Sequence, residues 1–399
     1  MEINTPIVCL AFPAWEGDYL KSTVQLVSRL AKDHPVLYVD YAYTWKDFFA
    51  AVLSGKGHAP WKRMLGLQPR LRRVQTAVGS SLWLLTLPPV LPINFIKNNA
   101  LHDFLMSINA ARIKKAVQAA MRQLKWENPV VLNAFLPGYG SKLAGRLGER
   151  RLVYYCYDEI KAAAWAGRHG ARWEKQLCSK VDAMVVSSEG LAASKSGMHP
   201  GIRVVKNGVD AAAFAKQAAP PLIPGREQFD KVIGYIGSVD DRLDGDLLAA
   251  AATRFPEHLL VFAGRVTDNK LAARLQQFPN VYLAGPQPVA SLPAWVQQFD
   301  AGLIPFVANE LTAGIYPLKI NEYLAAGVPV VSTNFAPLKE FEPFICLATQ
   351  QEAFLEGIHR ALIAPDDTAI ASGRKMAASN DWNARAAALS VCLIPKNGQ

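Results

Sequence analysis

The stretch Gly314-Ile-Tyr-Pro-Leu-Lys-Ile-Asn-Glu-Tyr-Leu-Ala-Ala-Gly-Val-Pro-Val-Val-Ser-Thr333 carries the strongest pattern in this sequence. Pro317 suits the first turn of a helix, where its missing N–H costs no hydrogen bond. Gly327 favours the end of that helix. We therefore predict a helix over Leu318–Ala326 and, after it, a strand over Val328–Ser332.

Lys319 and Glu322 lie three residues apart, so the predicted helix places them on roughly the same face near its start. A helix N-terminus offers free N–H groups and a positive dipole, which together suit a diphosphate. Lys319 would add a cation to the phosphates, and Glu322 could accept two hydrogen bonds from ribose hydroxyls. The alternative is a surface ion pair, which contributes little to stability.

Short apolar runs alternate with helical patterns on both sides of this stretch, which is typical of α/β proteins with parallel sheets. The Pro- and Gly-rich stretch 216–226 separates two such series and indicates a linker. Two successive sheets place a ligand near the C-terminal ends of strands, in a cleft between domains. The predicted strands are Ile7–Phe12, Val36–Tyr41, Leu82–Leu87, Val130–Asn133, Leu152–Tyr157, Ala183–Ser187 and Arg203–Val205, then Val232–Ile236, Leu259–Ala263, Val281–Ala284, Ala301–Ile304 and Val328–Ser332.

The length of 399 residues suggests two domains, and a hydrophobic content of 51% excludes a disordered chain. The five cysteines are widely spaced and odd in number, which argues against a disulfide framework or a structural zinc site and favours a reducing cytoplasm.

The net charge of +10 is concentrated in the first half of the chain. Residues 1–200 contain 26 Lys and Arg against 14 Asp and Glu, whereas residues 201–399 contain 17 against 19. This asymmetry suggests that one domain meets an anionic partner. Nucleic acid, anionic lipid headgroups and a phosphorylated acceptor all fit, and so does a basic surface kept for solubility.

The stretch 56–73 mixes six basic residues with tryptophan, methionine and leucine. That mixture suits a segment at a membrane interface, and a solvated basic loop is the alternative. The uncharged stretch 74–96 that follows is interrupted by three prolines, so we predict no transmembrane helix. The candidate membrane- or acceptor-binding residues are Trp61, Lys62, Arg63, Arg70, Arg72 and Arg73.

The sequence YPLKINEYLAAGVPVVST at 316–333 resembles the donor-site motif of GT-B glycosyltransferases, close to glycosyltransferase family 4, the glycosyl transferases group 1. In that family the glutamate binds the ribose of the nucleotide and the lysine contacts the donor phosphates. Further segments similar to the family, in the same order, are KNGVD at 206–210, GYIGS at 234–238, FAGR at 262–265, VYLAGP at 281–286, DAGLIP at 300–305 and DWNAR at 381–385.

The resemblance implies an α/β protein with the GT-B fold: two Rossmann-like domains facing across a cleft, and a C-terminal helix that crosses back to the N-terminal domain. We expect an acceptor-side domain over residues 1–215 with 378–399, a linker over 216–226, and a donor-binding domain over 227–377. The expected donor-binding residues are Gly237, Ser238, Arg242, Arg265, Gly314, Ile315, Tyr316, Pro317, Leu318, Lys319 and Glu322.

Two features depart from the family pattern. Members often have a second glutamate upstream of the first, and here Gly314 occupies that place. The usual GR-x4-K pair after the first donor strand is also missing, and the nearby cation is Arg242. Arg242 could approach the diphosphate or pair with Asp240, Asp241 or Asp244, so we expect a diphosphate site built mainly from backbone groups and Lys319.

Three carboxylates in the first half are candidate catalytic residues. Asp158 follows the strand Leu152–Tyr157 at a place where many relatives have a His-Asp pair, and a helix N-cap is the alternative reading of this residue. Glu16 and Asp18 lie in the loop after the first strand, where donor and acceptor approach closely in relatives.

Together these features predict a glycosyltransferase that moves a sugar from a nucleotide-diphosphate sugar, UDP- or GDP-linked, to a lipid-linked saccharide acceptor. We expect a retaining, metal-independent enzyme of bacterial surface polysaccharide biosynthesis, without a cofactor. It would be cytoplasmic, on the anionic inner face of the plasma membrane, and would bind no nucleic acid. The rival hypotheses are a non-catalytic nucleotide- or glycan-binding protein of the same fold and a sugar-nucleotide epimerase.

Overall fold

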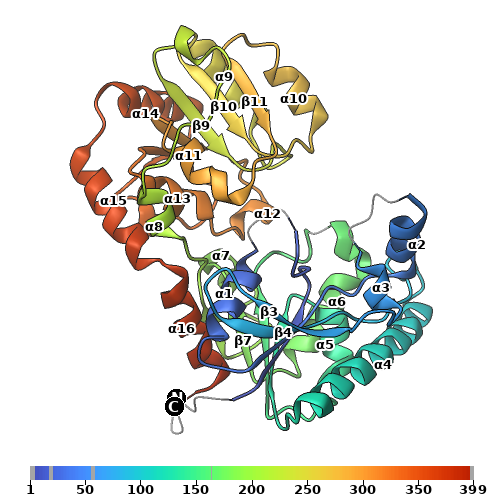
Figure 1. The fold of residues 1–399 in the computed structure, drawn as a ribbon. Helices are drawn as coiled ribbons and strands as arrows, with labels where there is room; N and C mark the ends of the chain where they lie inside the picture. Colours follow the sequence, from blue (N-terminus) through green and yellow to red (C-terminus); the bar gives the residue numbers. More distant parts are fainter. Residues whose placement is uncertain (1–4, 18–20, 55–58, 163, 396–399) are drawn as a thin grey trace. The chain divides into compact units, whose positions relative to one another are not determined.

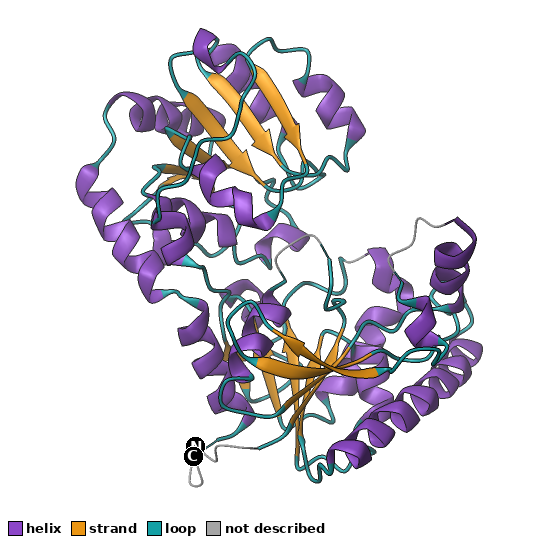
Figure 2. Cartoon of the chain, viewed as in Figure 1, coloured by secondary structure: helices purple, strands orange, loops and turns teal. Residues whose placement is uncertain are grey.

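The computed structural model describes residues 5–17, 21–54, 59–162 and 164–395. The chain divides into two compact units: unit 1 contains Met1–Lys206 with Arg385–Gln399, and unit 2 contains Asn207–Ala384. The division falls before the stretch 216–226 that we expected as the linker, and that stretch lies inside unit 2. Each unit is built on one sheet with helices packed against it (Figures 1 and 2).

Unit 1 contains an eight-stranded sheet with the order β3-β4-β2-β1-β5-β6-β7-β8. All neighbouring strands are parallel except β3 and β4, which pair antiparallel. Every residue of β1, β2, β5 and β7 is buried, as expected for parallel strands whose two faces are both covered. The strands are β1 (Ile7–Ala11), β2 (Val36–Val39), β3 (Leu71–Gln75), β4 (Ser81–Leu85), β5 (Val130–Ala134), β6 (Arg151–Cys156), β7 (Ala183–Val186) and β8 (Ile202–Val204).

The helices of unit 1 connect these strands, and α4 is the longest of them at 26 residues. The side chain of Asn98 caps α4 by accepting a hydrogen bond from the Leu101 N–H at 2.9 Å. No helix among the described residues is long and apolar enough to cross a bilayer. The helices are α1 (Ser22–Leu30), α2 (Trp45–Ser54), α3 (Trp61–Met64), α4 (Asn99–Leu124), α5 (Pro137–Leu143), α6 (Gly170–Cys178) and α7 (Glu189–Ser194), with a 3₁₀ helix over Ala164–His169.

Unit 2 contains a six-stranded, wholly parallel sheet with the order β11-β10-β9-β12-β13-β14. The chain runs outward from β9 to β11 and then returns to place β12 on the other side of β9. The strand order therefore reverses between β9 and β12, and α/β sheets bind ligands at the C-terminal ends of strands at such a point. The strands are β9 (Val232–Ile236), β10 (Leu259–Ala263), β11 (Val281–Gly285), β12 (Ala301–Ile304), β13 (Val330–Thr333) and β14 (Cys346–Ala348).

Helix α13 spans Leu318–Ala326, as the sequence predicts. It ends at Gly327, whose φ of 79° lies in the left-handed region that favours glycine. The other helices of unit 2 are α8 (Ala211–Ala215), α9 (Gly245–Arg254), α10 (Asn269–Leu275), α11 (Leu292–Val296), α12 (Glu310–Ala313), α14 (Gln351–Ile363) and α15 (Asp367–Ser379).

The last helix, α16 (Trp382–Leu393), begins in unit 2, and from Arg385 onward it belongs to unit 1. Its C-terminal part is bound to the sheet of unit 1, where the Arg151 guanidinium donates a hydrogen bond to the Cys392 carbonyl at 3.2 Å.

Candidate functional site

Lys319 lies directly against the turn that follows β9 in unit 2. A Cβ atom on Gly237, the first residue of that turn, would overlap the Lys319 side chain and lie 3.0 Å from its ammonium nitrogen. The φ of Gly237 is 132°, a backbone conformation that residues other than glycine rarely adopt. The lysine ammonium also lies 5.5 Å from the ring centroids of Tyr235 and Phe306. The fold thus brings a glycine turn and a cation together at the switch point, where the strand order reverses between β9 and β12.

The N-terminus of α13 opens beside this lysine. Pro317 precedes the first turn, and no side chain caps the helix. Hydrogen bonds to Asn321 hold the loop that leads into α13. The buried Asn321 amide donates to the Tyr316 hydroxyl at 3.1 Å and accepts from the Asn380 amide at 2.9 Å. Backbone N–H groups, a helix dipole and an ammonium group are therefore held in one place, which is the arrangement that binds phosphate.

Burial shifts the pKa values of both charged residues of the predicted motif, Lys319 and Glu322. It lowers the pKa of Lys319 from 10.5 to about 8, and repulsion from Arg242 adds to this effect. It raises the pKa of Glu322 from 4.5 to about 7, although the positive charge of Lys319 opposes the shift. An anion bound beside Lys319 would raise the pKa of the lysine again and so hold its positive charge. Perturbed pKa values of two neighbouring groups are typical of a functional site.

Arg242 forms a two-pronged ion pair with Asp240, with hydrogen bonds of 2.9 and 2.5 Å. This pairing is one of the two alternatives that the sequence left open for Arg242. The guanidinium also lies 5.6 Å from the centroid of the Phe306 ring, so it remains near Lys319. Arg242 is therefore paired with a carboxylate, whereas no ion pair within 4 Å is found for Lys319 among the described residues.

The other predicted donor-binding residues are distributed around the same edge of the sheet of unit 2. The carbonyl of Ser238 accepts a hydrogen bond from the Tyr235 hydroxyl at 3.2 Å. Arg265, which follows β10, is exposed. Gly314 is the C-cap of α12, the residues from Ile315 to Pro317 connect α12 to α13, and Leu318 is the first residue of α13.

Unit 1 has a pocket of about 410 Å³ at its own switch point, between β1 and β5. Phe12 follows β1 and Phe135 follows β5, and their rings pack edge to face with centroids 6.2 Å apart. Aromatic side chains line much of this pocket, and Trp173 lies in its wall. A concave, aromatic site with a few polar groups is typical of pockets that bind small molecules. The sequence did not single out this pocket, because its lining residues come from distant loops.

A stacked pair of histidines, His102 and His169, also lines this pocket. Their ring centroids lie 3.8 Å apart, and both rings are almost fully buried. The Nε2 atom of His169 lies 2.8 Å from the Ile96 carbonyl. Burial lowers the pKa of His102, and a positive charge on His169 would lower it further. No sequence pattern favours these two histidines, since they are 67 positions apart.

Asp158 lies in a loop two residues beyond the end of β6 and is partly exposed. Its Oδ1 atom accepts a hydrogen bond from the Glu159 N–H at 2.9 Å. No helix begins at Asp158, because the next helical turn starts at Ala164. The alternative reading of Asp158 as a helix N-cap is therefore wrong.

Of the other two candidate carboxylates, Glu16 and Asp18, the structure describes only the first. Glu16 forms an ion pair with Arg72, and the glutamate side chain remains 70% exposed. Asp18 lies outside the described residues. The loop that contains Glu16 is held by Asp40, a buried carboxylate at the end of β2, which accepts hydrogen bonds from the Trp15 N–H at 2.8 Å and the Tyr41 N–H at 3.0 Å.

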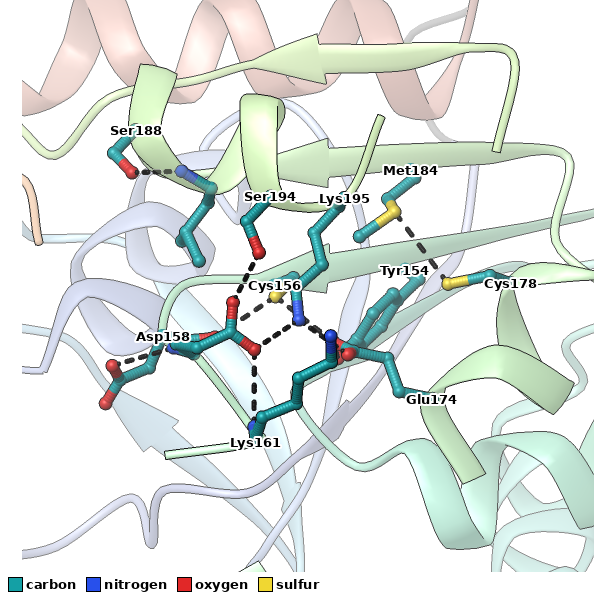
Figure 3. A network of polar contacts seen from close by, with 12 residues as sticks. Tyr154, Cys156, Asp158, Lys161, Glu174, Cys178, Met184, Ser188, Ser194 and Lys195 are labelled. Carbon is teal, nitrogen blue, oxygen red and sulfur yellow. Dashed lines mark hydrogen bonds and ion pairs between the residues drawn. The ribbon is translucent and has the colours of Figure 1, made fainter. Parts of the chain in front are cut away.

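Behind the Asp158 loop lies a buried ionic network (Figure 3). The fully buried Lys195 ammonium contacts Glu159 Oε1 at 2.6 Å and Glu174 Oε2 at 2.7 Å. The Tyr154 hydroxyl donates to Glu174 at 2.9 Å. Burial alone would raise the pKa of Glu159, but hydrogen bonds from Lys195 and Ser194 outweigh it and hold the pKa low. This network joins β6, α6 and α7 and fixes the backbone next to Asp158.

The basic stretch of unit 1 is more structured than the sequence suggested. Residues 61–64 form α3 and residues 71–75 form the edge strand β3, so the reading of 56–73 as a solvated loop is wrong for these parts. Arg70 donates to the carbonyls of residues 63 and 64, and Arg73 donates to the Ser81 hydroxyl at 3.0 and 2.7 Å. Lys62 is exposed, and its ammonium lies 5.5 Å from the centroid of the Trp61 ring.

Comparisons with known proteins agree with this geometry. The family model described as Glycosyl transferases group 1 matches residues 230–369, which lie in unit 2 and include α13. A protein of Bacillus subtilis (strain 168), described as a candidate teichuronic acid biosynthesis glycosyltransferase, TuaH, is 26% identical over 261 residues. That match spans 58% of this chain and 64% of the relative's length. The resemblance to group 1 glycosyltransferases is thereby confirmed.

Solved structures show the fold of the whole chain. Sucrose-phosphate synthase from Thermosynechococcus elongatus is similar with a TM-score of 0.70 and 17% identity, over 98% of both chains. The Anabaena protein HepE, in complex with UDP, is similar with a TM-score of 0.63 and 14% identity, over 98% of this chain and 99% of the other. The chain has the GT-B fold, with two Rossmann-like α/β units.

Proposed function

We propose that this protein is a nucleotide-sugar-dependent glycosyltransferase with a lipid-linked saccharide as its acceptor. Unit 2 binds the nucleotide-diphosphate sugar, and unit 1 binds the acceptor. The observation that carries the proposal is the position of Lys319 against Gly237 beside the open N-terminus of α13. The match of residues 230–369 to group 1 glycosyltransferases supports the same role for unit 2.

The donor site supplies what a diphosphate leaving group requires. The first N–H groups of α13 and the Lys319 ammonium bind the diphosphate, while Glu322 accepts hydrogen bonds from the ribose hydroxyls. As the bond between the anomeric carbon and the diphosphate oxygen breaks, negative charge grows on that oxygen, and Lys319 stabilises it. Because Lys319 is largely withdrawn from water, its charge acts more strongly on the diphosphate than an exposed lysine would.

The acceptor site belongs to unit 1 in this proposal. An acceptor hydroxyl oxygen forms a bond to the anomeric carbon, and its proton passes to a base, for which Asp158 is the candidate. The aromatic pocket between β1 and β5 supports binding of the acceptor saccharide, since sugar rings stack on aromatic faces. The acceptor oxygen approaches the anomeric carbon from the face that the diphosphate leaves, so the anomeric configuration is retained, and the reaction needs no metal ion.

The setting of the reaction is the synthesis of a bacterial surface polysaccharide at the inner face of the plasma membrane. The similarity to a relative described for teichuronic acid biosynthesis supports this setting, and the UDP complex of HepE supports a uridine nucleotide as donor. The basic excess of residues 1–200 is consistent with an anionic surface next to unit 1.

The experiment is a transfer assay with radiolabelled UDP- and GDP-sugars and a bacterial lipid extract as acceptor. The expected result is release of the nucleoside diphosphate together with label in the organic phase, and no transfer by Lys319→Met. Binding of a nucleoside diphosphate without transfer to any lipid or saccharide fraction would instead identify a non-catalytic binding protein.

A further inference from the structure

A second hollow of unit 1, distinct from the aromatic pocket, combines positive charge with apolar surface. It is a groove of about 480 Å³ bordered by the start of α2, the end of α3 and the middle of α4. These three helices lie together in Figure 1. Arg70, Arg112 and Lys115 supply the charge of this groove, and Trp45, Leu65 and Pro89 contribute to its apolar wall.

The three cations of the groove lack a protein counter-charge among the described residues. Arg70 is held in place by the carbonyls of residues 63 and 64, at 3.2 and 2.9 Å. Arg112 is held by the Pro89 carbonyl at 3.3 Å. Hydrogen bonds to carbonyls orient a guanidinium but leave its positive charge unneutralised. Lys115 is exposed on α4. No aspartate or glutamate lines the groove, so an anionic ligand is the natural complement.

The sequence around the groove is depleted in acidic residues over a long distance. Between Asp47 and Asp103 the chain contains seven Lys and Arg and no carboxylate. Such a one-sided charge favours a ligand that presents many negative groups at once, as the surface of an anionic bilayer does.

Large apolar side chains are exposed next to the groove on α2 and after α3. Phe49 and Leu53 lie one helical turn apart on α2 and are 53% and 81% exposed, and Leu67 is 67% exposed. Other residues of α2 pack on α3 through Met64, so the two elements form one surface. Exposed aromatic and aliphatic side chains beside cations are the pattern of a surface that enters the headgroup region of a membrane.

We infer that the groove bounded by α2, α3 and α4 binds the phosphate of an anionic phospholipid while Phe49, Leu53 and Leu67 enter the bilayer. This inference deepens the membrane-held acceptor of the proposed function and rests on it for its biological meaning. It keeps Leu67 and Arg70 of the basic stretch 56–73 in the membrane contact and adds α2 and α4. Arg72 and Arg73 are left out, since Arg72 is engaged by Glu16 and Arg73 by Ser81.

The test is co-sedimentation of the full chain with vesicles of phosphatidylcholine, alone or mixed with phosphatidylglycerol. Lys115→Glu should weaken binding to the mixed vesicles at least about fivefold, because each cation near an anionic surface contributes about that factor. Arg122→Glu is the matched control: it makes a similar charge reversal on α4, two turns beyond Lys115 and outside the groove, and should change binding less than twofold. Leu53→Ser should weaken binding to both vesicle types about tenfold.

Equal losses in Lys115→Glu and Arg122→Glu would overturn the groove as a lipid site, since net charge alone would then explain binding. Wild-type binding that does not depend on phosphatidylglycerol would overturn it as well. Nucleoside diphosphate binding to unit 2, measured by calorimetry on the same variants, tests the proposed function separately. A variant that loses vesicles but keeps the nucleotide supports the inference, and loss of both in Lys115→Glu would contradict it.

Discussion

Replacing Lys319 by methionine should make the protein more stable and its donor binding weaker. Without donor, Lys319 is held in a largely buried place with no carboxylate within 4 Å among the described residues, and its pKa falls from 10.5 to about 8. A shift of that size corresponds to about 3 kcal/mol of unfavourable free energy in the folded state. Residual solvent screening and the two aromatic rings near the ammonium offset part of this cost, by about 1–2 kcal/mol.

Methionine fills a similar volume without the charge, so Lys319→Met should stabilise unit 2 by about 1–2 kcal/mol at pH 7. For a unit of this size, that raises the melting temperature by about 2–8 °C. The stabilisation should shrink between about pH 8 and 10.5, because the folded wild-type protein loses the proton of Lys319 there and with it the penalty. Lys270→Met, which removes an exposed lysine from α10, is the control and should leave the melting temperature unchanged.

Donor binding should respond in the opposite direction. Loss of a charged contact to phosphate costs about 1.5–3 kcal/mol, so the affinity of Lys319→Met for UDP should fall about tenfold to a hundredfold. Differential scanning calorimetry and titration calorimetry measure the two effects on the same samples. A lower melting temperature in Lys319→Met, or an unchanged UDP affinity, would refute the reasoning, because Lys319 would then serve the fold and not the ligand.

Three further outcomes are expected at the two units. UDP affinity, measured by calorimetric titration, should be highest between about pH 7 and 8 and fall on both sides. Glu322 gains a proton below this range, and Lys319 loses one above it. An affinity that rises steadily up to pH 10 would contradict the role of the lysine. Gly237→Ala should lower the free energy of unfolding by about 1–3 kcal/mol, because a φ of 132° is strained for alanine. It should also lower the affinity for UDP, because the added methyl group displaces Lys319. Denaturant unfolding measures the first effect. Asp158→Asn should lower turnover more than donor affinity, and wild-type rates would remove Asp158 from the reaction.

The sequence was sufficient to predict most of unit 2. The strands Val232–Ile236, Leu259–Ala263 and Ala301–Ile304 were predicted with their observed bounds, because buried parallel strands are short continuous apolar runs between clear breakers. Helix Leu318–Ala326 was predicted equally well, since a proline and a glycine mark its two ends.

Unit 1 was predicted less completely, for physical reasons. Strand β3 has alternating exposure at a sheet edge and contains two arginines, so its apolar signal is weak. The pairing of Arg72 with Glu16 joins positions 56 residues apart, and the stacking of two histidines in one pocket wall depends on the packing of α4 against the 3₁₀ helix that ends at His169. Such contacts arise from tertiary structure and leave no periodic pattern in the sequence.

In the candidate site, too, features within one element could be predicted from the sequence, and contacts between distant or competing residues could not. Lys319 and Glu322 could be predicted as a pair because both belong to one helix, where spacing determines which side chains share a face. Arg242 could not be assigned from the sequence, because three nearby aspartates could each have paired with it, and only the structure shows that Asp240 does.

The most direct test of the central claim is titration calorimetry of UDP and GDP into the wild-type protein and Glu322→Ala. We predict that one of the two nucleotides binds to the wild-type protein. Glu322→Ala should bind that nucleotide at least about tenfold more weakly, because the ribose hydroxyls lose their acceptor. Equal affinity of both proteins, or no binding of either nucleotide, would contradict a donor site at α13.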